Sequence, residues 1–278
     1  MLPRLSVLAA LLLGACDSSV SIDLSSADGE GLQSVVLSID GVQLRDGDGT
    51  RQRLQTQTSG IEMRDLLAGQ SRSLISGFSV AEGRYTGLRL SFDEDAEQTL
   101  RLQTGAQFNL RLDDQDQFFD IDLNVEEDED ARLIAVLDLR FSLRQTDADD
   151  YRLSPYLRLV NADQAASIDG SISAGAVSSS DCAADGTPGN SVAVYLFKGA
   201  DAEPIDFNRS RLGPFASAAV RPADNGFAYT LAFLPAGDYR IAWTCDGDID
   251  QPEASETLRF RDAQSISLDE GESRLLNF

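Results

Sequence analysis

The carboxylates are the side chains of this chain with the most evident capacity for chemistry, since Asp and Glu together number 46 among 278 residues. Three of them, Asp246, Asp248 and Asp250, alternate along one short stretch. Carboxylate oxygens on loops are preferred calcium ligands, and this alternation puts three of them within reach of one ion. The stretch lacks the glycine and the closing glutamate of an EF-hand loop. We therefore keep two interpretations, a calcium site of another kind and a solvated acidic turn, which is the commoner structure.

Histidine is absent from the sequence, and this excludes several classes of reaction. A chain without imidazole has no Ser-His-Asp or Cys-His triad, no His-ligated zinc or copper and no imidazole proton shuttle. The only lysine is Lys198, which leaves little scope for Schiff-base chemistry. A carboxylate-pair hydrolase needs no histidine and stays an alternative, although no pair stands out among the 46 acidic residues. The sequence therefore predicts a non-enzymatic protein with no catalytic residues and no cofactor besides the calcium considered above.

The acidic excess also restricts the partners of the protein. The formal net charge is −23, and 23 basic side chains are present. Nucleic acids and anionic lipid headgroups are bound through clustered Lys and Arg, so a chain of this charge repels both. We expect no nucleic-acid partner.

The N-terminus predicts export. Arg4 precedes an apolar run over residues 5–13, which is too short to span a bilayer and has the length of a signal-peptide core. The sequence Leu13-Gly14-Ala15-Cys16 resembles the lipobox of bacterial lipoproteins, which implies cleavage before Cys16 and acylation of that residue. Its acyl chains would anchor the protein stably in a membrane. An ordinary cleaved secretory signal and an apolar cytosolic N-terminus are the alternatives.

The residue after Cys16 bears on which bacterial membrane would hold the lipid anchor. Asp17 resembles the inner-membrane retention signal of enteric lipoproteins, a rule that does not hold in all bacteria. We expect a lipid anchor in the bacterial cell envelope, in the outer membrane by preference and in the inner membrane if the retention rule applies.

The two remaining cysteines predict a disulfide. With Cys16 acylated, Cys182 and Cys245 form an even pair in an oxidising compartment outside the cytosol. Two free thiols are the alternative.

Hydrophobic periodicity predicts an all-β fold. Apolar and polar residues alternate over residues 119–125 and again over residues 137–143, which is typical of antiparallel strands with one buried face. Residues 20–24, 34–44, 84–92, 99–104 and 151–160 read as further strands. Within residues 34–44 the alternation changes parity at Gly41, which predicts either a bulge with a positive φ or a two-residue Asp-Gly hairpin. Asp46-Gly47-Asp48-Gly49 predicts a turn.

The order of three blocks carries a family resemblance. The blocks are residues 35–44 (VVLSIDGVQL), residues 61–69 (IEMRDLLAG) and residues 82–90 (EGRYTGLRL). Together they resemble DUF4382, a domain of unknown function common in bacterial lipoproteins, over residues 18–160. The resemblance implies a β-sandwich envelope protein and brings no catalytic residues with it.

A second β unit follows a small, polar stretch at residues 161–167, which reads as a linker. Seven short predicted strands between residues 168 and 278, one of them at residues 256–260, fit a Greek-key sandwich. The block Phe233-Leu-Pro-Ala-Gly-Asp-Tyr239 resembles the Leu-x-x-Gly-x-Tyr signature of prealbumin-like and carboxypeptidase-regulatory-like domains. Gly83-Arg84-Tyr85 is a similar device in the first unit. Alternation also places Trp243 on the same strand face as Cys245, which predicts a tryptophan packed on the disulfide, with a sugar-stacking tryptophan as the alternative.

These observations give one interpretation of the whole chain. We expect a signal peptide at residues 1–15, a β-sandwich domain at residues 16–160, a linker at residues 161–167 and a Greek-key, prealbumin- or immunoglobulin-like sandwich at residues 168–278. The expected function is a lipid-anchored, non-enzymatic binding or scaffold module of the cell envelope, with an envelope protein or polysaccharide as partner. A calcium-stabilised carbohydrate-binding or adhesion module is the alternative, followed by the carboxylate-pair hydrolase.

Overall fold

The computed structural model describes residues 18–56, 60–113, 116–147, 150–178, 182, 192–209, 213–224 and 226–278. The predicted signal peptide and Cys16 lie outside the described residues. Strands dominate the described chain, and its helices are single turns, which confirms the all-β fold class. None of the helices among the described residues has the length and apolarity needed to cross a membrane.

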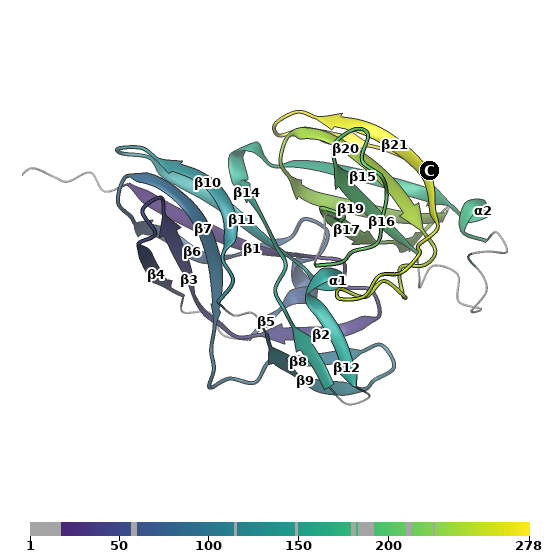
Figure 1. The fold of residues 1–278 in the computed structure, drawn as a ribbon, viewed down its shortest axis with the longest axis horizontal. Helices are drawn as coiled ribbons and strands as arrows, with labels where there is room; N and C mark the ends of the chain where they lie inside the picture. Colours follow the sequence, from purple (N-terminus) through teal and green to yellow (C-terminus); the bar gives the residue numbers. More distant parts are fainter. Residues whose placement is uncertain are drawn as a thin grey trace, which may run out of the picture.

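Three sheets form the N-terminal part of the molecule, β1 to β14 (Figure 1). The first sheet contains, in spatial order, β14 (Leu157–Asn161), β11 (Asp130–Asp138), β1 (Ser19–Ala27) and β6 (Ser71–Ser79). The second contains β10 (Phe119–Val125), β7 (Gly83–Phe92), β3 (Ile39–Asp46) and β4 (Arg51–Gln55). The third contains β12 (Leu143–Asp147), β13 (Asp150–Leu153), β9 (Gln107–Leu112), β8 (Thr99–Leu102), β2 (Leu32–Leu37) and β5 (Ile61–Glu62). The helical turns η1 (Met63–Leu66), α1 (Leu139–Ser142) and η2 (Ala162–Gln164) complete this part.

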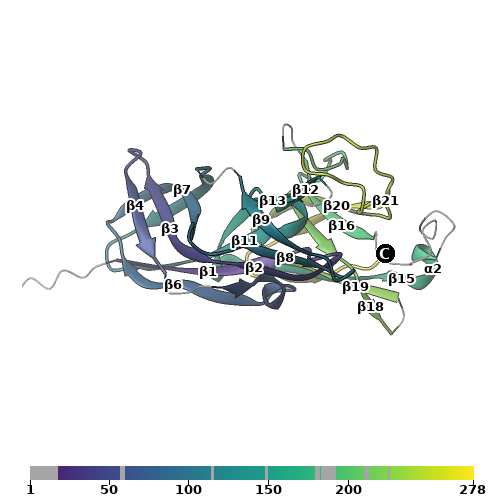
Figure 2. The same cartoon turned by 90° about the horizontal axis from the view of Figure 1, so that it is seen from below.

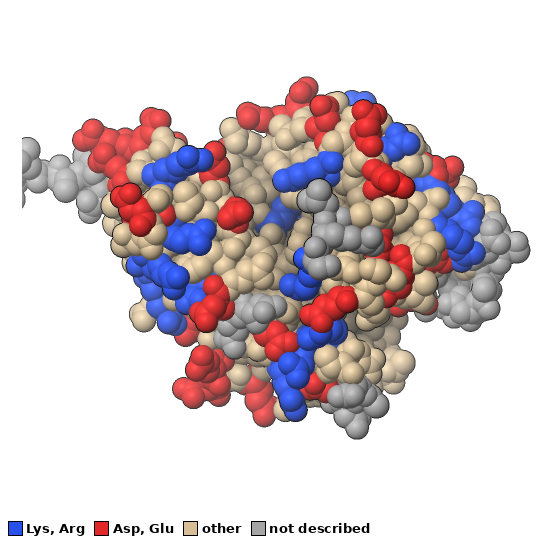
Figure 3. Space-filling model, viewed as in Figure 1, with Lys and Arg blue, Asp and Glu red and all other residues tan. Residues whose placement is uncertain are grey.

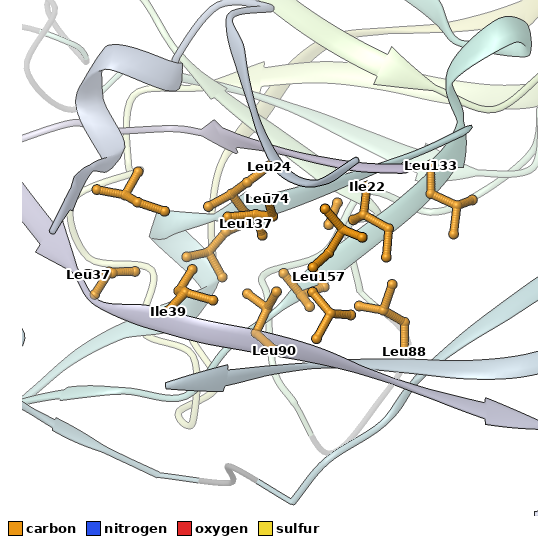
Figure 4. Close-up of a cluster of buried hydrophobic side chains, with 14 of the residues drawn as sticks. Ile22, Leu24, Leu37, Ile39, Leu74, Leu88, Leu90, Leu133, Leu137 and Leu157 are labelled. Carbon is orange, nitrogen blue, oxygen red and sulfur yellow. The ribbon is translucent and has the colours of Figure 1, made fainter. Parts of the chain in front are cut away.

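The first two sheets enclose the core of the N-terminal part. Figure 4 shows Ile22, Leu24 and Leu137 from the first sheet facing Leu88 and Leu90 from the second. All five side chains are buried, as the apolar positions of alternating strands must be when one face is covered. The arrangement is a β-sandwich.

Two sheets form the C-terminal part, β15 to β22 (Figure 2). One contains β18 (Arg221–Ala223), β19 (Gly226–Leu234), β15 (Ala166–Ser173) and β22 (Ser273–Leu275). The other contains β17 (Ala216–Ala219), β16 (Ala193–Lys198), β20 (Gly237–Thr244) and β21 (Phe260–Leu268). A helical turn, α2 (Ala174–Val177), follows β15. A separate buried cluster fills the space between these sheets.

The sheets are mixed, whereas the sequence predicts antiparallel pairing. Three of the observed strand pairs are parallel: β1 with β11, β13 with β9 and β15 with β22. Alternation reports only that one face of a strand is buried, and it carries no information on the direction of the neighbouring strand.

The parity change at Gly41 is a bulge, as one of the two interpretations predicts. In the pairing of β3 with β7, the register shifts between Ile39 and Gly41. The expected positive φ is wrong, because Gly41 is not among the glycines with positive φ. Glycine is required for space, since a Cβ at this position would lie 2.6 Å from the carbonyl oxygen of Leu54 on β4. The predicted turn after β3 is present, since Asp46 N donates to the carbonyl of Thr50 at 3.0 Å.

Four predicted strands are wrong in detail. Residues 151–160 divide between β13 and β14, which belong to different sheets. Residues 34–44 divide between β2 and β3, which belong to different sheets. Residues 137–143 alternate, yet β11 ends at Asp138 and α1 follows, because the Asp138 carboxylate accepts from the backbone N of Phe141 and starts the helical turn. Residues 256–260 contain no strand before Phe260, where β21 begins.

The similar glycine-tyrosine devices of the two units have the same geometry. Gly83 and Gly237 open β7 and β20 with φ values of 133° and 152°. Two residues later, the hydroxyl of Tyr85 donates to the carbonyl of Ala81 at 2.9 Å, and the hydroxyl of Tyr239 donates to that of Pro235 at 2.7 Å. Each tyrosine therefore ties its strand to the backbone four residues upstream, as in a tyrosine corner.

Candidate functional site

The predicted disulfide is present, and it lies in the core of the C-terminal part. Cys182 and Cys245 are bonded, with their Cα atoms 5.1 Å apart. Trp243 is 1% exposed and belongs to the same buried cluster, as its strand position predicts. Its indole Nε1 donates to Asp262 at 2.9 Å, so the one polar atom of the ring is satisfied. This tryptophan is a core residue.

The three aspartates of the predicted calcium site have separate surroundings. Asp246 accepts from Arg259, whose Nε lies 3.0 Å from Oδ2, and these hydrogen bonds lower its pKa. Asp248 is exposed, whereas Asp250 is buried and accepts from the hydroxyl of Tyr195 at 2.7 Å. Among the described residues, the carboxylate group that could hold an ion includes Asp250 but neither Asp246 nor Asp248. Calcium binding by the three aspartates stays a prediction.

A different group of carboxylates converges beside Asp250. Among the described residues, ligand atoms of Asp206, Asp250 and Glu256 all lie within 4.8 Å of one another. Burial raises the pKa of Asp250 to about 6. Oε2 of Glu256 is buried and has no hydrogen-bond partner. The sequence analysis missed Asp206, which comes from a distant segment, and Glu256, which lies six residues after Asp250 and outside the alternating aspartates.

The junction between the N-terminal and C-terminal parts carries a concentration of buried charge. Asp138 is fully buried, and its carboxylate accepts from the backbone N and the hydroxyl of Ser217 on β17, at distances of 2.9 to 3.0 Å. Burial, together with the nearby charge of Asp28, raises the pKa of Asp138 to about 7. This carboxyl links β11 of one part to β17 of the other.

Arg140 forms a second link across the junction. Its Nε donates to the carboxylate of Asp28 at 2.6 Å, and the exposed fractions of the two side chains are 8% and 1%. The same guanidinium pairs with Glu30 and donates to the carbonyl of Gly247 in the C-terminal part. Burial raises the pKa of Glu30 to about 7, although Arg140 opposes this effect.

Aromatic rings fill the remaining contact at the junction. Phe141 stacks on Phe207 with their centroids 4.0 Å apart, and Tyr156 meets Phe207 edge-on at 5.1 Å. Tyr195 also contacts Phe141, at 6.1 Å. We call Phe141, Tyr156, Tyr195, Phe197 and Phe207 the junction cluster.

A cavity of about 290 Å³ lies at the same junction. It is lined by β1, the turn after it and β14 from the N-terminal part, and by β17, β18 and β19 from the C-terminal part. We call it the junction cavity. Arg158 on β14 lines it and reaches across, because its Nε and Nη2 donate to the carbonyls of Phe233 and Ala232 at 3.0 and 2.9 Å. Burial lowers the pKa of Arg158, and Asp138 opposes this effect.

The chemistry that this arrangement can perform is binding. Raised pKa values of carboxyl groups are typical of general acids, but Asp138 is 0% exposed and cannot contact a substrate. Its partners are structural groups, namely a serine and the first turn of α1. Pockets between rigid units, with mixed apolar walls and a few polar groups, are the usual places for small ligands.

The sequence analysis missed the junction residues for a definite reason. Asp138 and Arg158 occupy polar positions of alternating stretches, which assigns them to the solvent side of the sheet. That side is covered by the C-terminal part, and no signal in a single sequence reports which exposed sheet face a second unit covers.

On the face of the molecule shown in Figure 3, the acidic side chains do not form one continuous patch. Lys and Arg side chains are interspersed among Asp and Glu side chains there. One group of arginines surrounds the ring of Phe118, with Arg45, Arg51 and Arg89 at 4.9 to 5.2 Å from its centroid.

Solved structures resemble the chain only distantly. The Bacillus anthracis TIE protein is 12% identical with a TM-score of 0.21, and the match covers 94% of this chain and 33% of that one. The chain thus spans about a third of its length. The minor pilin GBS52 of Streptococcus agalactiae is 9% identical with a TM-score of 0.21 and 94% coverage of both chains. The fimbrial anchor protein Mfa2 of Porphyromonas gingivalis is 10% identical with a TM-score of 0.19, and 84% of this chain and 80% of that one are covered.

Sequence comparison is more decisive than these structures. No curated protein matches the chain. The profile of the family described as "Domain of unknown function (DUF4382)" matches residues 17–155, which is half of the chain and includes the three blocks that resemble it. The prealbumin-like resemblance of the C-terminal part stays a prediction. From the match over its N-terminal half, we conclude that the chain belongs to the DUF4382 family.

Proposed function

We propose that this protein is an exported, lipid-anchored and non-enzymatic module of the bacterial cell envelope, which holds its C-terminal part away from the membrane to bind or space another envelope component. In this proposal, residues 16–160 and 168–278 are two domains joined by residues 161–167. Acylated Cys16 is the anchor.

The observation that carries the proposal is the position of Ser18. Its hydroxyl donates to the carbonyl of Glu126 at 2.7 Å, and its own carbonyl accepts from Val80 at 3.0 Å. The first described residue is therefore fixed at one end of the N-terminal part, and α2 lies at the opposite end of the molecule in both views (Figures 1 and 2). Two residues span at most about 7 Å, so an anchor at Cys16 would hold the end near Ser18 against the membrane.

The buried contacts of the junction support the second half of the proposal. Ion pairs, the Asp138–Ser217 hydrogen bonds and the junction cluster join the two parts through buried groups. A junction of this kind resists bending more than a polar linker alone would. The C-terminal part would then stand at a fixed distance from the bilayer.

Energy transfer to a membrane dye tests this orientation. A donor is placed at exposed Glu127 or at exposed Ala174 of the full-length chain in vesicles, with an acceptor lipid in the bilayer. We expect strong transfer from position 127 and weak transfer from position 174, and a Cys16→Ala chain should show neither. Equal transfer from the two positions would contradict the proposed orientation.

A calcium-stabilised module is the second candidate function, and the convergence of Asp206, Asp250 and Glu256 favours it. A thermal melt with chelator, magnesium or a calcium titration at matched ionic strength tests it. A saturating, calcium-selective rise in melting temperature that Glu256→Gln removes and Asp248→Asn keeps would place a site there. Equal small shifts with both cations would indicate charge screening and count against this candidate.

A further inference from the structure

The junction cavity contains a buried cation with an unused donor. Arg158 is 4% exposed, and two of its nitrogens bind the carbonyls of Phe233 and Ala232. The third, Nη1, is buried and has no hydrogen-bond partner. A buried donor that is left unpaired costs stability, and a buried charge without a counter-ion costs more.

Within the part of the chain that the structure describes, no carboxylate forms an ion pair with Arg158. Asp138 is the acid whose charge acts on it most strongly, but the oxygens of Asp138 accept from Ser217 and Phe141 instead. The guanidinium lies over the ring of Phe215, at 5.6 Å from its centroid, and this contact leaves the in-plane N–H groups of Nη1 free. The cation therefore keeps one position for an anionic acceptor.

The acidic residues of the junction cavity do not compete for that position. Asp28 and Glu30 line the cavity, and both pair with Arg140. The remaining charged lining residues, Arg64 and Arg221, are basic. The cavity thus has a local excess of positive charge in a protein whose net charge is −23.

The backbone around the junction cavity is strained. Five non-glycine residues in the described chain have positive φ, and three of them line this cavity. They are Asp28 at 46°, Ala68 at 55° and Phe233 at 54°. Conformations of this kind are unfavourable for residues with a side chain and gather at ligand sites, where the surrounding structure holds them. Three separate segments are held in this way around one cavity.

The rest of the lining is suited to an apolar body. Leu67, Val136, Val220, Phe227 and Leu231 contribute aliphatic and aromatic surface. Val136 pairs with Arg158 across β11 and β14, so the two side chains lie next to each other on one face of the sheet. A ligand that contacts both side chains needs a hydrogen-bond acceptor for Arg158 and an adjacent apolar part for Val136.

We propose that the junction cavity is a binding site for a small organic carboxylate, whose carboxylate accepts from Nη1 of Arg158 and whose apolar body packs on Val136 and its neighbours. The site goes beyond the anchored-module function and does not depend on it. Since its walls come from both parts of the molecule, an occupied cavity would also stabilise the junction.

Calorimetric titration of the full-length chain with hexanoate and benzoate tests the site, with hexanamide and benzamide as uncharged probes of the same shape. We expect saturable binding of a carboxylate with a Kd on the order of 1 mM, as suits a ligand of this size. The amides should bind at least about tenfold more weakly, because they lose the charge-assisted hydrogen bond to Arg158.

Two variants locate the binding. Arg158→Gln should weaken the carboxylate about tenfold or more, whereas Arg53→Gln, which removes an exposed guanidinium paired with Asp40, should leave its Kd unchanged. Ala219→Leu adds bulk to the cavity from β17 and keeps the Arg158 guanidinium in the chain, and it should abolish binding even if Arg158→Gln fails to fold. The proposal is overturned if neither carboxylate binds saturably, if the amides bind equally well, or if Ala219→Leu binds as the natural chain does.

Discussion

Asp138 shows how a single residue joins local structure to the whole molecule. Its carboxylate starts α1 by accepting from Phe141, and it also accepts from Ser217 across the junction. Both roles follow from one buried side chain at the end of β11. Asp28 and Arg158 are the charged groups that act on it, with opposite signs.

Stability should fall as pH rises because of this residue. The pKa of Asp138 is about 7 in the folded chain and near 3.8 when unfolded, so the folded state holds a proton that the unfolded state has released. Between pH 4 and 7 the free energy of unfolding therefore decreases as pH rises, and above that window the effect is constant. Glu30 and Asp250 act with the same sign, since their pKa values are also raised.

The variant Asp138→Asn isolates this contribution. The loss of unfolding free energy between pH 5 and pH 8 should be smaller than in the natural chain by about 2 kcal/mol, because one titrating group is removed. Urea unfolding at the two pH values measures it. An unchanged pH dependence would mean that Asp138 is ionised in the folded state throughout this range.

Replacing Arg140 should lower the unfolding free energy much more than replacing Arg53, an arginine in an exposed ion pair. Arg140→Ala leaves the buried carboxylate of Asp28 without its cation, and we expect a loss of about 3 to 5 kcal/mol in unfolding free energy. Arg53→Ala breaks the exposed pair with Asp40, in which the side chains are 45% and 39% exposed, and should cost under about 1 kcal/mol. Equal losses in urea unfolding would contradict the buried role of Arg140.

At the scale of elements, the disulfide should stabilise the C-terminal part by restricting its unfolded chain. Cys182 and Cys245 are separated by 63 residues, and closing a loop of this length contributes about 4 kcal/mol. A double variant, Cys182→Ala with Cys245→Ala, should lose roughly this amount in denaturant unfolding. Reductant should destabilise the natural chain similarly and leave the double variant unaffected; a natural chain insensitive to reductant would contradict the assignment.

The elements also show where sequence reasoning succeeds. Alternation predicts β7 and β10 with small boundary errors, because each covers one side of a core. The equivalence of Tyr85 and Tyr239 is predictable as well, since a glycine two residues earlier marks both. The end of β11 at Asp138 is not, because a capping carboxylate replaces the next ladder bond without changing the alternation.

At the scale of the whole molecule, the junction could not be predicted from the sequence. Composition and spacing indicate two β units and a disulfide in the second, but they do not report which sheet faces meet. Arg158 and Asp138 lie at polar positions that a lone sandwich would expose, and they become buried only when the other part covers them. The junction cavity depends on the same contact and was missed for the same reason. Only Asp250 of the predicted calcium ligands belongs to the observed carboxylate group.

The central claim about the whole molecule is that Cys16 anchors it to the cell envelope, and mass spectrometry of the N-terminal peptide tests this most directly. The full-length chain is expressed in a bacterium that processes lipoproteins, purified from membranes and digested. We predict a peptide that begins at Cys16 and carries the added mass of acyl chains. A peptide that begins at Met1, or at any residue other than Cys16, or an unmodified Cys16, would contradict the proposed anchor.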